Sequence, residues 1–430
     1  MNVFRFLKWF YPGMYIKRWV FLAVVGGFLL AIGSALLTVD NSIPIRLLSL
    51  LFLMGGLLML VTGIQLTIRS LLEVVSPEHR RDLVDVVFQR RHLEKGPKIV
   101  VIGGGTGLAT LLHGLKQYTN NITAIVTVAD DGGSSGRLRR EFDMLPPGDI
   151  RNCLVALADT EPLMQQLFQY RFAEDSALKG HNFGNLFITA MTKITGDFER
   201  AVQASSKVLA IRGRVVPSTN AKVRLVAEHV DGSVTMGESK ISSAPARIQR
   251  IYLEPGGCQP TNEALEAIRA ANAIVLGPGS LYTSIIPNLL VDQMVDAIVQ
   301  SKALKIYVCN VMTQSRETYA FKASDHVRAI AAHTNPGIIQ VCIVNTQPVP
   351  ELLQERYRAE EAVPVEPDVE RIRELGYQTV AENTLSLDSY VRHDADKVAK
   401  IIIQLVVGAR GRSPAPIVVT APVVAEPVVG

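Results

Sequence analysis

Two long intervals without a charged residue stand near the start of this 430-residue chain. The first lies between Arg18 and Asp40, and the second lies between Arg46 and Arg69. Each holds about 20 residues, which as a helix match the roughly 30 Å hydrocarbon core of a bilayer. A signal peptide has a shorter apolar region and would not be followed at once by a second span. We therefore expect residues 1–72 to form a membrane anchor with two transmembrane helices, at about 19–39 and 47–68.

The basic residues around these intervals predict the orientation of the chain in the membrane. They precede the first interval or follow the second: Arg5, Lys8, Lys17, Arg18, Arg69, Arg80 and Arg81. The short connection carries only Asp40 and Arg46. The positive-inside rule then predicts a multi-pass protein of the cell membrane, with both termini and the large remainder in the cytoplasm. The four cysteines show neither close pairing nor metal-type spacing, which fits buried thiols in that reducing compartment.

The segments before and after residues 97–410 have their own sequence patterns. A helix should begin at Ser76-Pro77-Glu78 and end by Gly96-Pro97, so we expect residues 73–96 to be a connecting helix or linker. The tail at 411–430 is rich in Pro, Val and Ala without periodicity, and we expect it to be disordered. The net charge of +4 comes with no basic stripe interleaved with aromatics, so no nucleic-acid partner is expected.

Residues 97–410 alternate short β-rich runs with helical segments, which is typical of a mostly parallel α/β sheet. The strand-like runs are 98–102, 122–128, 273–276, 305–309 and 338–344. The helical segments are 108–117, 261–270, 290–301, 324–333 and a closing helix at 395–406. A small hairpin is expected at 223–235, with Asp231-Gly232 at its turn. The pattern predicts an α/β fold of the Rossmann-like, doubly wound type, preceded by the two transmembrane helices.

A glycine-rich turn follows the first predicted strand directly and precedes a helix. It consists of Gly103, Gly104, Gly105, Thr106 and Gly107. Glycines let a backbone approach phosphate closely, and the N–H groups at a helix N-terminus attract anions. The spacing does not fit the dinucleotide pattern G-x-G-x-x-G, because its last position is Leu108 or Thr110. The turn therefore predicts a phosphate-binding loop, with a tight strand-to-helix turn as the alternative.

A second polar segment follows the next strand and should face the same crevice. Its candidate ligand-binding residues are Asp130, Asp131, Gly132, Gly133, Ser134, Ser135 and Arg137. An acid here could bind a ribose hydroxyl, act as a base, or hold Mg²⁺ beside a diphosphate, and Asp131 is the candidate for the metal. The serines, the backbone and the arginine could bind phosphate. The alternative is that one aspartate only caps its own turn.

Three further segments add candidates. In the first, Asp149 caps a helix beginning around Arg151, or Arg151 and Asn152 reach the crevice. In the second, His181 opens an apolar helix without metal partners at useful spacing, so it serves as a cap or hydrogen-bonds a ligand. Asn182 and Asn185, beside it, could contact a sugar or base or serve as a cap and a polar face.

The third segment is a second glycine turn after a strand, and its candidates are Gly277, Gly279, Ser280 and Tyr282. Tyr282 could stack on a ligand or simply pack in the core. The chain has neither a G-x-S-x-G elbow nor a P-loop lysine, which disfavours esterases and P-loop NTPases.

These motifs in this order resemble the gluconeogenesis-factor (YvcK-like) branch of the CofD-like family. The matching runs are IGGGTG at 102–107, VADDGGSSGRLRREF at 128–142, PPGDIRNCL at 146–154, GHNFGNLF at 180–187, GPGSLYTSIIPNLL at 277–290 and NVMTQ at 310–314. The family commonly has a proline and a glycine where this chain has Ser315 and Arg316. The resemblance extends over about 97–408 and implies a Rossmann-like α/β sandwich.

The resemblance also implies a function and a ligand. Members of this branch resemble proteins that bind UDP-sugars, notably UDP-N-acetylglucosamine, and that are associated with cell shape and wall synthesis during growth on gluconeogenic carbon. The first glycine loop, Asp130 and Asp131 would then face the diphosphate, and Tyr282 would contact the nucleotide sugar. The sister branch, with magnesium, transfers a phospholactyl group from a guanosine diphosphate conjugate to a deazaflavin.

We therefore expect a membrane-anchored UDP-sugar-binding regulatory factor, with homo-oligomers and cell-wall synthesis proteins as candidate partners. The alternative is a Mg²⁺-dependent phospholactyl-type transferase using Asp130 or Asp131. Two further readings are a nicotinamide oxidoreductase, which the broken glycine fingerprint disfavours, and a structural anchor. Whether a reaction is catalysed stays open at this point.

Overall fold

The computed structural model describes residues 17–39, 42–75, 93–159, 162–173, 175–358, 361–386 and 390–410. The chain divides into two units, residues 1–90 and residues 91–430. Most of the expected connecting helix at 73–96, and the whole of the expected disordered tail at 411–430, lie outside the described residues.

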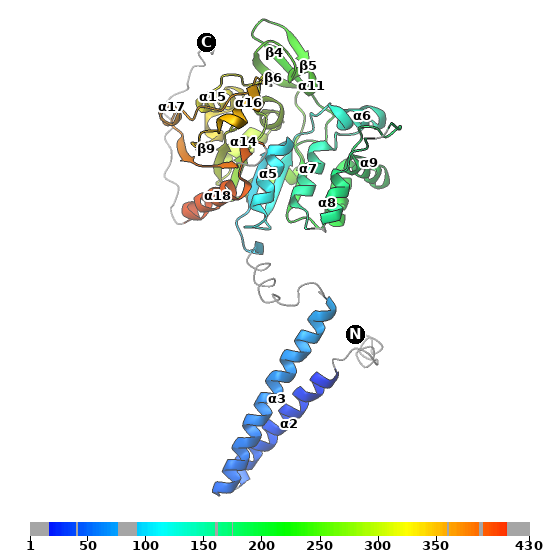
Figure 1. The fold of residues 1–430 in the computed structure, drawn as a ribbon, viewed down its shortest axis with the longest axis vertical. Helices are drawn as coiled ribbons and strands as arrows, with labels where there is room; N and C mark the ends of the chain where they lie inside the picture. Colours follow the sequence, from blue (N-terminus) through cyan, green and yellow to red (C-terminus); the bar gives the residue numbers. More distant parts are fainter. Residues whose placement is uncertain are drawn as a thin grey trace. The chain divides into compact units, whose positions relative to one another are not determined.

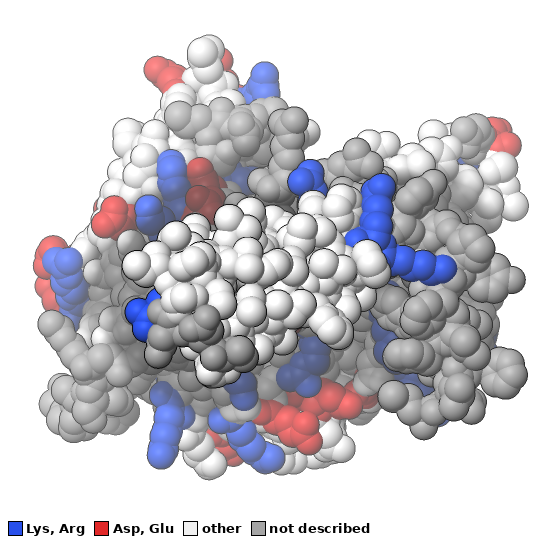
Figure 2. Space-filling model, turned by 90° about the horizontal axis from the view of Figure 1, so that it is seen from below, with Lys and Arg blue, Asp and Glu red and all other residues white. Residues whose placement is uncertain are grey.

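The N-terminal unit contains two long helices, α2 (Lys17–Val39) and α3 (Ile43–Val75), coloured blue in Figure 1. Both are long and apolar enough to cross a bilayer: an 18-residue window has a mean hydropathy of 2.5 within Lys17–Thr38 and of 2.4 within Ile43–Ser70. Large apolar side chains such as Phe21, Phe28 and Leu51 are exposed on them. Figure 2, seen from below, shows a broad central area without Lys, Arg, Asp or Glu. The two helices expected at 19–39 and 47–68 are therefore present in the fold.

Glycines allow the backbones of α2 and α3 to lie close together. A Cβ at Gly26 would be 2.5 Å from the backbone nitrogen of Leu60, and a Cβ at Gly63 would be 2.5 Å from that of Ala23. The Ser49 hydroxyl donates a hydrogen bond to the Gly33 carbonyl across the pair at 2.6 Å. Small residues at this spacing are typical of helices that pack tightly in apolar surroundings.

The second unit is built on a seven-stranded sheet within the described residues, in the order β10-β9-β8-β7-β1-β2-β3. Every neighbouring pair is parallel. The strands are β1 (Ile99–Gly103), β2 (Ile122–Val126), β3 (Arg214–Pro217), β7 (Ala273–Leu276), β8 (Leu304–Val308), β9 (Val341–Asn345) and β10 (Gln378–Glu382). The expected doubly wound Rossmann-like sheet is confirmed, although the sequence pattern did not indicate β3 and β10.

The strand order places a switch point between β1 and β7. From β1 the chain moves outward to β2 and β3, and it then returns to β7 on the other side of β1 and moves outward to β10. Ile99 pairs with Ile122 on one side and with Ala273 on the other. In such sheets ligands bind at the carboxyl ends of the two strands that flank the switch point. Both predicted glycine turns therefore leave the sheet at this one crevice.

Helices cover both faces of the sheet, because right-handed crossovers in opposite directions leave helices on opposite sides. One layer packs α5 (Gly105–Leu115) between α7 (Gly148–Leu157) and α18 (Ala395–Arg410). The other layer contains α12 (Asn262–Ala270), α14 (Met294–Gln300), α15 (Ala323–His333) and α17 (Val369–Glu374). Further helices lie beyond β2 in the chain: α6 (Gly133–Phe142), α8 (Pro162–Gln169), α9 (Phe183–Thr195) and α10 (Phe198–Val208).

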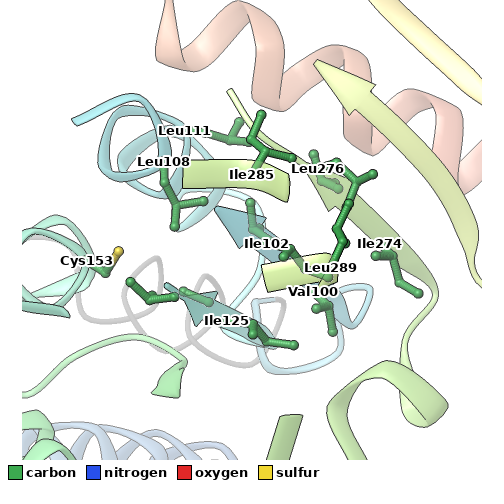
Figure 3. Close-up of a cluster of buried hydrophobic side chains, with 14 of the residues drawn as sticks. Val100, Ile102, Leu108, Leu111, Ile125, Cys153, Ile274, Leu276, Ile285 and Leu289 are labelled. Carbon is green, nitrogen blue, oxygen red and sulfur yellow. The ribbon is translucent and has the colours of Figure 1, made fainter. Parts of the chain in front are cut away.

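Apolar side chains from the central strands and the covering helices meet in one core (Figure 3). Val100 and Ile102 of β1 lie beside Ile274 and Leu276 of β7, and Leu108 of α5 packs against them. All five are at most 2% exposed. This continuous burial explains why the central strands read as uninterrupted apolar runs.

Two expected elements begin later than the sequence indicated. The helix expected at 290–301 starts only at Met294, because Gln293 takes a left-handed conformation with φ of 59°. The residues before it form a π-helical turn (Leu281–Ile285) and the short α13 (Ile286–Leu289). The strand expected at 338–344 starts at Val341, because Pro336–Ile338 form a 3₁₀ turn.

A three-stranded antiparallel sheet stands apart from the main one. It contains β4 (Arg224–His229), β5 (Val234–Met236) and β6 (Ile248–Glu254), with the short helix α11 (Glu238–Ile241) between β5 and β6. The hairpin expected at 223–235 is confirmed, and Asp231 accepts a hydrogen bond from the Ser233 N–H within its turn. The third strand, β6, and α11 were not expected. We call residues 218–256 the insertion.

Candidate functional site

A cavity of about 550 Å³ opens at the carboxyl ends of β1 and β7, the switch point of the sheet. Its wall combines the two glycine turns, part of the insertion, the segment after β8 and two segments near the C-terminal helix. The lining residues are Gly104, Gly105, Thr106, Gly107, Thr110, Glu238, Ser242, Pro278, Gly279, Ser280, Thr283, Ser284, residues 310–317, Tyr357, Ala362, Val391, Arg392 and His393. The volume lies in the range of small-molecule sites.

The first glycine turn forms one wall because its backbone packs directly against other loops. A Cβ at Gly104 would lie 2.5 Å from Asp149 Oδ2, and a Cβ at Gly107 would lie 2.7 Å from the Pro278 carbonyl oxygen. Gly105 has a φ of 67°, which side chains rarely adopt. The turn brings the N-terminus of α5 to the cavity, where first-turn N–H groups have no helical acceptor. This geometry can bind a phosphate group.

The second glycine turn is held open by side chains from the segment after β8. Asn310 accepts a hydrogen bond from the Gly279 N–H at 3.1 Å and donates one to the Gly279 carbonyl at 2.8 Å. Gln314 donates to the Ser280 hydroxyl at 2.5 Å. Ser315 and Arg316, where the chain departs from the family pattern, also line the cavity. The cavity therefore depends on the 310–317 segment as much as on the glycines.

Asp149 is a buried acid directly behind the first glycine turn. Helix α7 begins at Gly148, so Asp149 lies in its first turn and makes no capping contact there. Its carboxylate instead accepts a hydrogen bond from the Gly105 N–H. Burial, with the nearby charge of Asp130, raises the pKa of Asp149 to about 6. The sequence suggested only a cap for this residue.

Two glutamates that the sequence did not single out form the acidic end of the cavity. Glu317 accepts hydrogen bonds from the Ser242 hydroxyl at 2.9 Å and the Thr283 hydroxyl at 3.4 Å. Burial raises its pKa to about 7. Glu238 projects from α11, and burial together with the surrounding carboxylates raises its pKa to about 9. The sequence offers one signal for Glu317, which lies three residues beyond the 310–314 motif. It offers no such signal for Glu238.

The Asp130–Asp131 pair is not among the residues that line this cavity. Asp130 accepts a hydrogen bond from the Gly132 N–H of its own turn at 2.8 Å, which is the capping alternative. Burial raises its pKa, and its charge acts on Asp149. Asp131 accepts a hydrogen bond from the Ser239 N–H at 2.9 Å and so holds the start of α11. The pair therefore supports the residues that face the cavity.

Predicted polar residues from the segments at 130–137 and 181–185 meet around one buried hydroxyl, that of Ser134. Ser134 lies within hydrogen-bond distance of His181 Nδ1, at 3.2 Å, and of the Asn185 side-chain nitrogen, at 3.2 Å. The Asn182 side chain caps α9 by accepting from the Asn185 N–H, at 3.3 Å. These side chains bind one another and not the wall of the 550 Å³ cavity.

The remaining candidates of those segments also lie away from that cavity. Arg137 donates to the Lys179 carbonyl, and Asn152 accepts a hydrogen bond from Arg151. Gly132 and Gly133 open α6, where Gly133 has a φ of 48°. Ser135 hydrogen-bonds the Asp130 carboxylate. Gly103 ends β1 and Gly277 directly follows β7, next to the lining residues Gly104 and Pro278.

Tyr282 lies in the core. Its side chain is 3% exposed, and its ring makes edge contacts with Phe321 and His333 at centroid distances of 6.4 and 5.9 Å. This is the packing alternative for Tyr282. The aromatic residue that lines the cavity is Tyr357, whose hydroxyl accepts a hydrogen bond from the Val391 N–H.

Another part of the cavity wall, which the sequence did not indicate, contains Tyr357, Arg392 and His393. Arg392 is exposed and lies over the Tyr390 ring at 5.1 Å. His393 is buried between the Thr384 hydroxyl and the Cys309 carbonyl, and burial lowers its pKa to about 4, so its ring is neutral. This part of the wall therefore offers one cation and one aromatic ring to a ligand.

The described residues do not form a metal centre. No group of three His, Cys, Asp or Glu side chains in this part of the chain could hold a metal ion. The Asp131 carboxylate, which the sequence suggested for Mg²⁺, is bonded to the Ser239 N–H. A magnesium ion at Asp131 would therefore take most of its ligands from a bound phosphate and from water.

Comparison with known proteins agrees with the motifs. The family described as "2-phospho-L-lactate transferase CofD" matches residues 99–385. A putative gluconeogenesis factor from Nostoc sp. is 49% identical over 95% of this chain and 94% of its own length. The gluconeogenesis factor of Bacillus subtilis is 49% identical over 72% of this chain and 98% of its own length. The Nostoc match thus takes in the N-terminal helices, whereas the second match has about the length of the body.

A solved structure shows the same fold. A Bacillus halodurans protein, described as a member of the upf0052 family, is 50% identical with a TM-score of 0.70. The match covers 72% of this chain and 99% of that one. With its switch-point cavity, its motifs and these relatives, the chain belongs to the CofD-like family, in the branch whose members are named gluconeogenesis factors.

Proposed function

We propose that the body binds a UDP-sugar, UDP-N-acetylglucosamine foremost, in the switch-point cavity. The observation that carries the proposal is the meeting of two glycine turns and the α5 N-terminus in a cavity whose wall also holds Arg392 and Tyr357. Helix N–H groups and an arginine suit a diphosphate, and an aromatic ring suits a base or sugar. The volume of about 550 Å³ accommodates a ligand of this size.

The role of this binding is regulatory in our proposal. The relatives described above are called gluconeogenesis factors, a name that states no reaction. A regulator must couple ligand binding to a second surface through different affinities of two states. We propose that the UDP-sugar level reports carbon supply and that the liganded body adjusts cell-wall synthesis and cell shape.

The body is anchored to the cytoplasmic side of the cell membrane in this proposal. Two apolar helices of sufficient length and the basic residues outside them support the anchor. Fractionation tests it: the full chain should stay with membranes after an alkaline wash, and a chain starting at residue 96 should be released. Release of the full chain would contradict membrane anchoring and leave the ligand proposal standing.

Calorimetric titration of residues 96–412 tests the ligand. These residues lie within the second unit of the chain. The Bacillus subtilis relative, which matches over 98% of its own length, has about the same length as this fragment. UDP-N-acetylglucosamine, UDP-glucose, GTP and NADH are compared with and without Mg²⁺, and the ligand is recovered afterwards. Selective binding of an intact UDP-sugar supports the proposal. Magnesium-dependent breakdown of the ligand would favour the transferase alternative. Tight binding of NADH would favour an oxidoreductase, and the absence of binding to any of the four ligands would favour a structural anchor.

A further inference from the structure

Three buried acceptor oxygens on the cavity wall have no hydrogen-bond partner among the described residues. They are Glu238 Oε2, Glu317 Oε2 and Gln314 Oε1. A buried acceptor without a donor is costly, because it has lost the water that would otherwise bond to it. Three such atoms on one wall therefore indicate that a ligand brings donors to this end of the cavity.

The two glutamates come from separate parts of the chain and are fixed by different contacts. Glu317 is 6% exposed, and its other oxygen is already bonded to Ser242 and Thr283. Glu238 is placed by α11, whose first turn is held through Ser239 by Asp131. Ser242, at the end of α11, ties the insertion to Glu317. The insertion thus carries one acid of the pair and orients the other.

The part of the cavity wall with Glu238, Glu317 and Gln314 favours a ligand group that carries several hydrogen-bond donors. A diphosphate at neutral pH supplies only acceptors, and the carboxylates around Glu238 repel its charge. A sugar ring supplies several hydroxyl donors, and an acetamido group adds an N–H. A sugar ring therefore fits this wall better than a phosphate does.

We propose that Glu238 and Glu317, with Gln314, form the sugar subsite and make the cavity select a nucleotide sugar over the bare nucleotide diphosphate. The inference rests on the proposed function, because it assigns one end of the same ligand. The diphosphate then lies toward the α5 N-terminus and Arg392. Asp131 is a positioning residue, since it acts through α11.

The test compares two ligands on three variants of the chain. Isothermal titration at pH 7 measures the affinity of UDP and of UDP-N-acetylglucosamine for the wild type, Glu317→Gln and Glu238→Gln. The matched control is Glu228→Gln, an acid on β4 of the same insertion that does not line the cavity. The midpoint of thermal unfolding is recorded for each variant, so that a misfolded protein is recognised. If one of the two glutamate variants is misfolded, the proposal is tested with the other.

The expected result is a change in selectivity and not in overall affinity. The ratio of the UDP dissociation constant to that of UDP-N-acetylglucosamine should fall roughly tenfold in Glu317→Gln and in Glu238→Gln, the effect of losing about one hydrogen bond. The affinity for UDP should stay equal in Glu238→Gln, because a carboxyl with a pKa of about 9 is already neutral at pH 7, and it should stay equal or rise in Glu317→Gln, which removes part of a negative charge. Glu228→Gln should behave as the wild type.

Other outcomes separate the two proposals. An unchanged ratio in both variants, or an equal loss for both ligands, would overturn the sugar subsite and leave UDP-sugar binding intact. A wild type that binds UDP and UDP-N-acetylglucosamine equally would overturn the subsite as well. A wild type that binds neither would overturn the proposed function itself, and the subsite with it.

Discussion

The Asp131 carboxylate accepts a hydrogen bond from the Ser239 N–H at 2.9 Å, across 108 positions of sequence. The contact joins the loop after β2 to the first turn of α11 in the insertion. Through it, the acid that the sequence assigned to a ligand or metal instead fixes the neighbour of Glu238. The same bond explains why Gly237 is a glycine, since a Cβ there would strike the Asp131 carboxylate.

Asp131→Ala should weaken sugar-dependent binding without unfolding the body. Loss of the bond to Ser239 loosens α11 and displaces Glu238, so the affinity for UDP-N-acetylglucosamine should fall roughly tenfold while UDP binds as before. Calorimetry with both ligands measures this. Asp231→Ala is the matched control, because it removes a similar bond to Ser233 within the insertion but away from the cavity. Equal effects of the two substitutions would show that the Asp131 contact has no special role.

The adjacent glycines of the first turn should differ in their tolerance of alanine. A Cβ at Gly104 would lie 2.5 Å from Asp149 Oδ2 and 2.7 Å from Thr127 Cγ2, whereas one at Gly103 would have its nearest neighbour at 3.7 Å. Gly104→Ala should therefore cost about 1–3 kcal/mol of unfolding free energy and weaken ligand binding. Gly103→Ala should have little effect on the unfolding free energy or on ligand binding. Chemical denaturation and calorimetry check both, and equal tolerance would refute this account of the turn.

Tyr282 should contribute to stability and little to ligand affinity. Tyr282→Ala leaves a cavity against Phe321 and His333 and should cost about 3–5 kcal/mol. Tyr282→Phe should keep the ligand affinity of the wild type. Tyr357→Ala is the comparison, because this ring lines the cavity on a helix without buried residues, and it should lower affinity with little loss of stability. A lower affinity in Tyr282→Phe would instead support the ligand contact implied by the family resemblance.

The body should lose stability as the pH rises from about 5 to about 9. The pKa of Asp149, Glu317 and Glu238 is raised to about 6, 7 and 9, so the folded state holds protons that the unfolded state has released. These groups stabilise the fold fully below their ordinary pKa values of 3.8 and 4.5, and the stabilisation is lost as the pH rises through the raised values.

Urea denaturation at pH 5, 7 and 9 measures this loss, which should be on the order of a few kcal/mol. Glu238→Gln cannot ionise, so the variant should lose less between pH 7 and pH 9 than the wild type does. A stability that increases over this interval in the wild type would contradict the buried, protonated carboxyls.

The sequence by itself determined the elements whose signal is local. Uncharged runs of bilayer length indicated α2 and α3, and continuous apolar runs such as 273–276 indicated the buried central strands. The glycine turn at 103–107 was readable for the same reason, because close backbone approach requires several glycines within a few residues. Strands with a weaker pattern, such as the edge strands β3 and β10, were not found.

Only the tertiary structure decided which of these segments meet. The pairing of β1 with β7 on one side and β2 on the other brings the two glycine turns together, and no periodicity encodes the order of parallel strands. It also placed Tyr282 in the core, left Asp130 and Asp131 out of the cavity lining, and brought Glu238 and Glu317 to the cavity. Local patterns record whether a residue is buried, whereas its partners depend on contacts between segments far apart in the chain, and these form only when the sheet assembles.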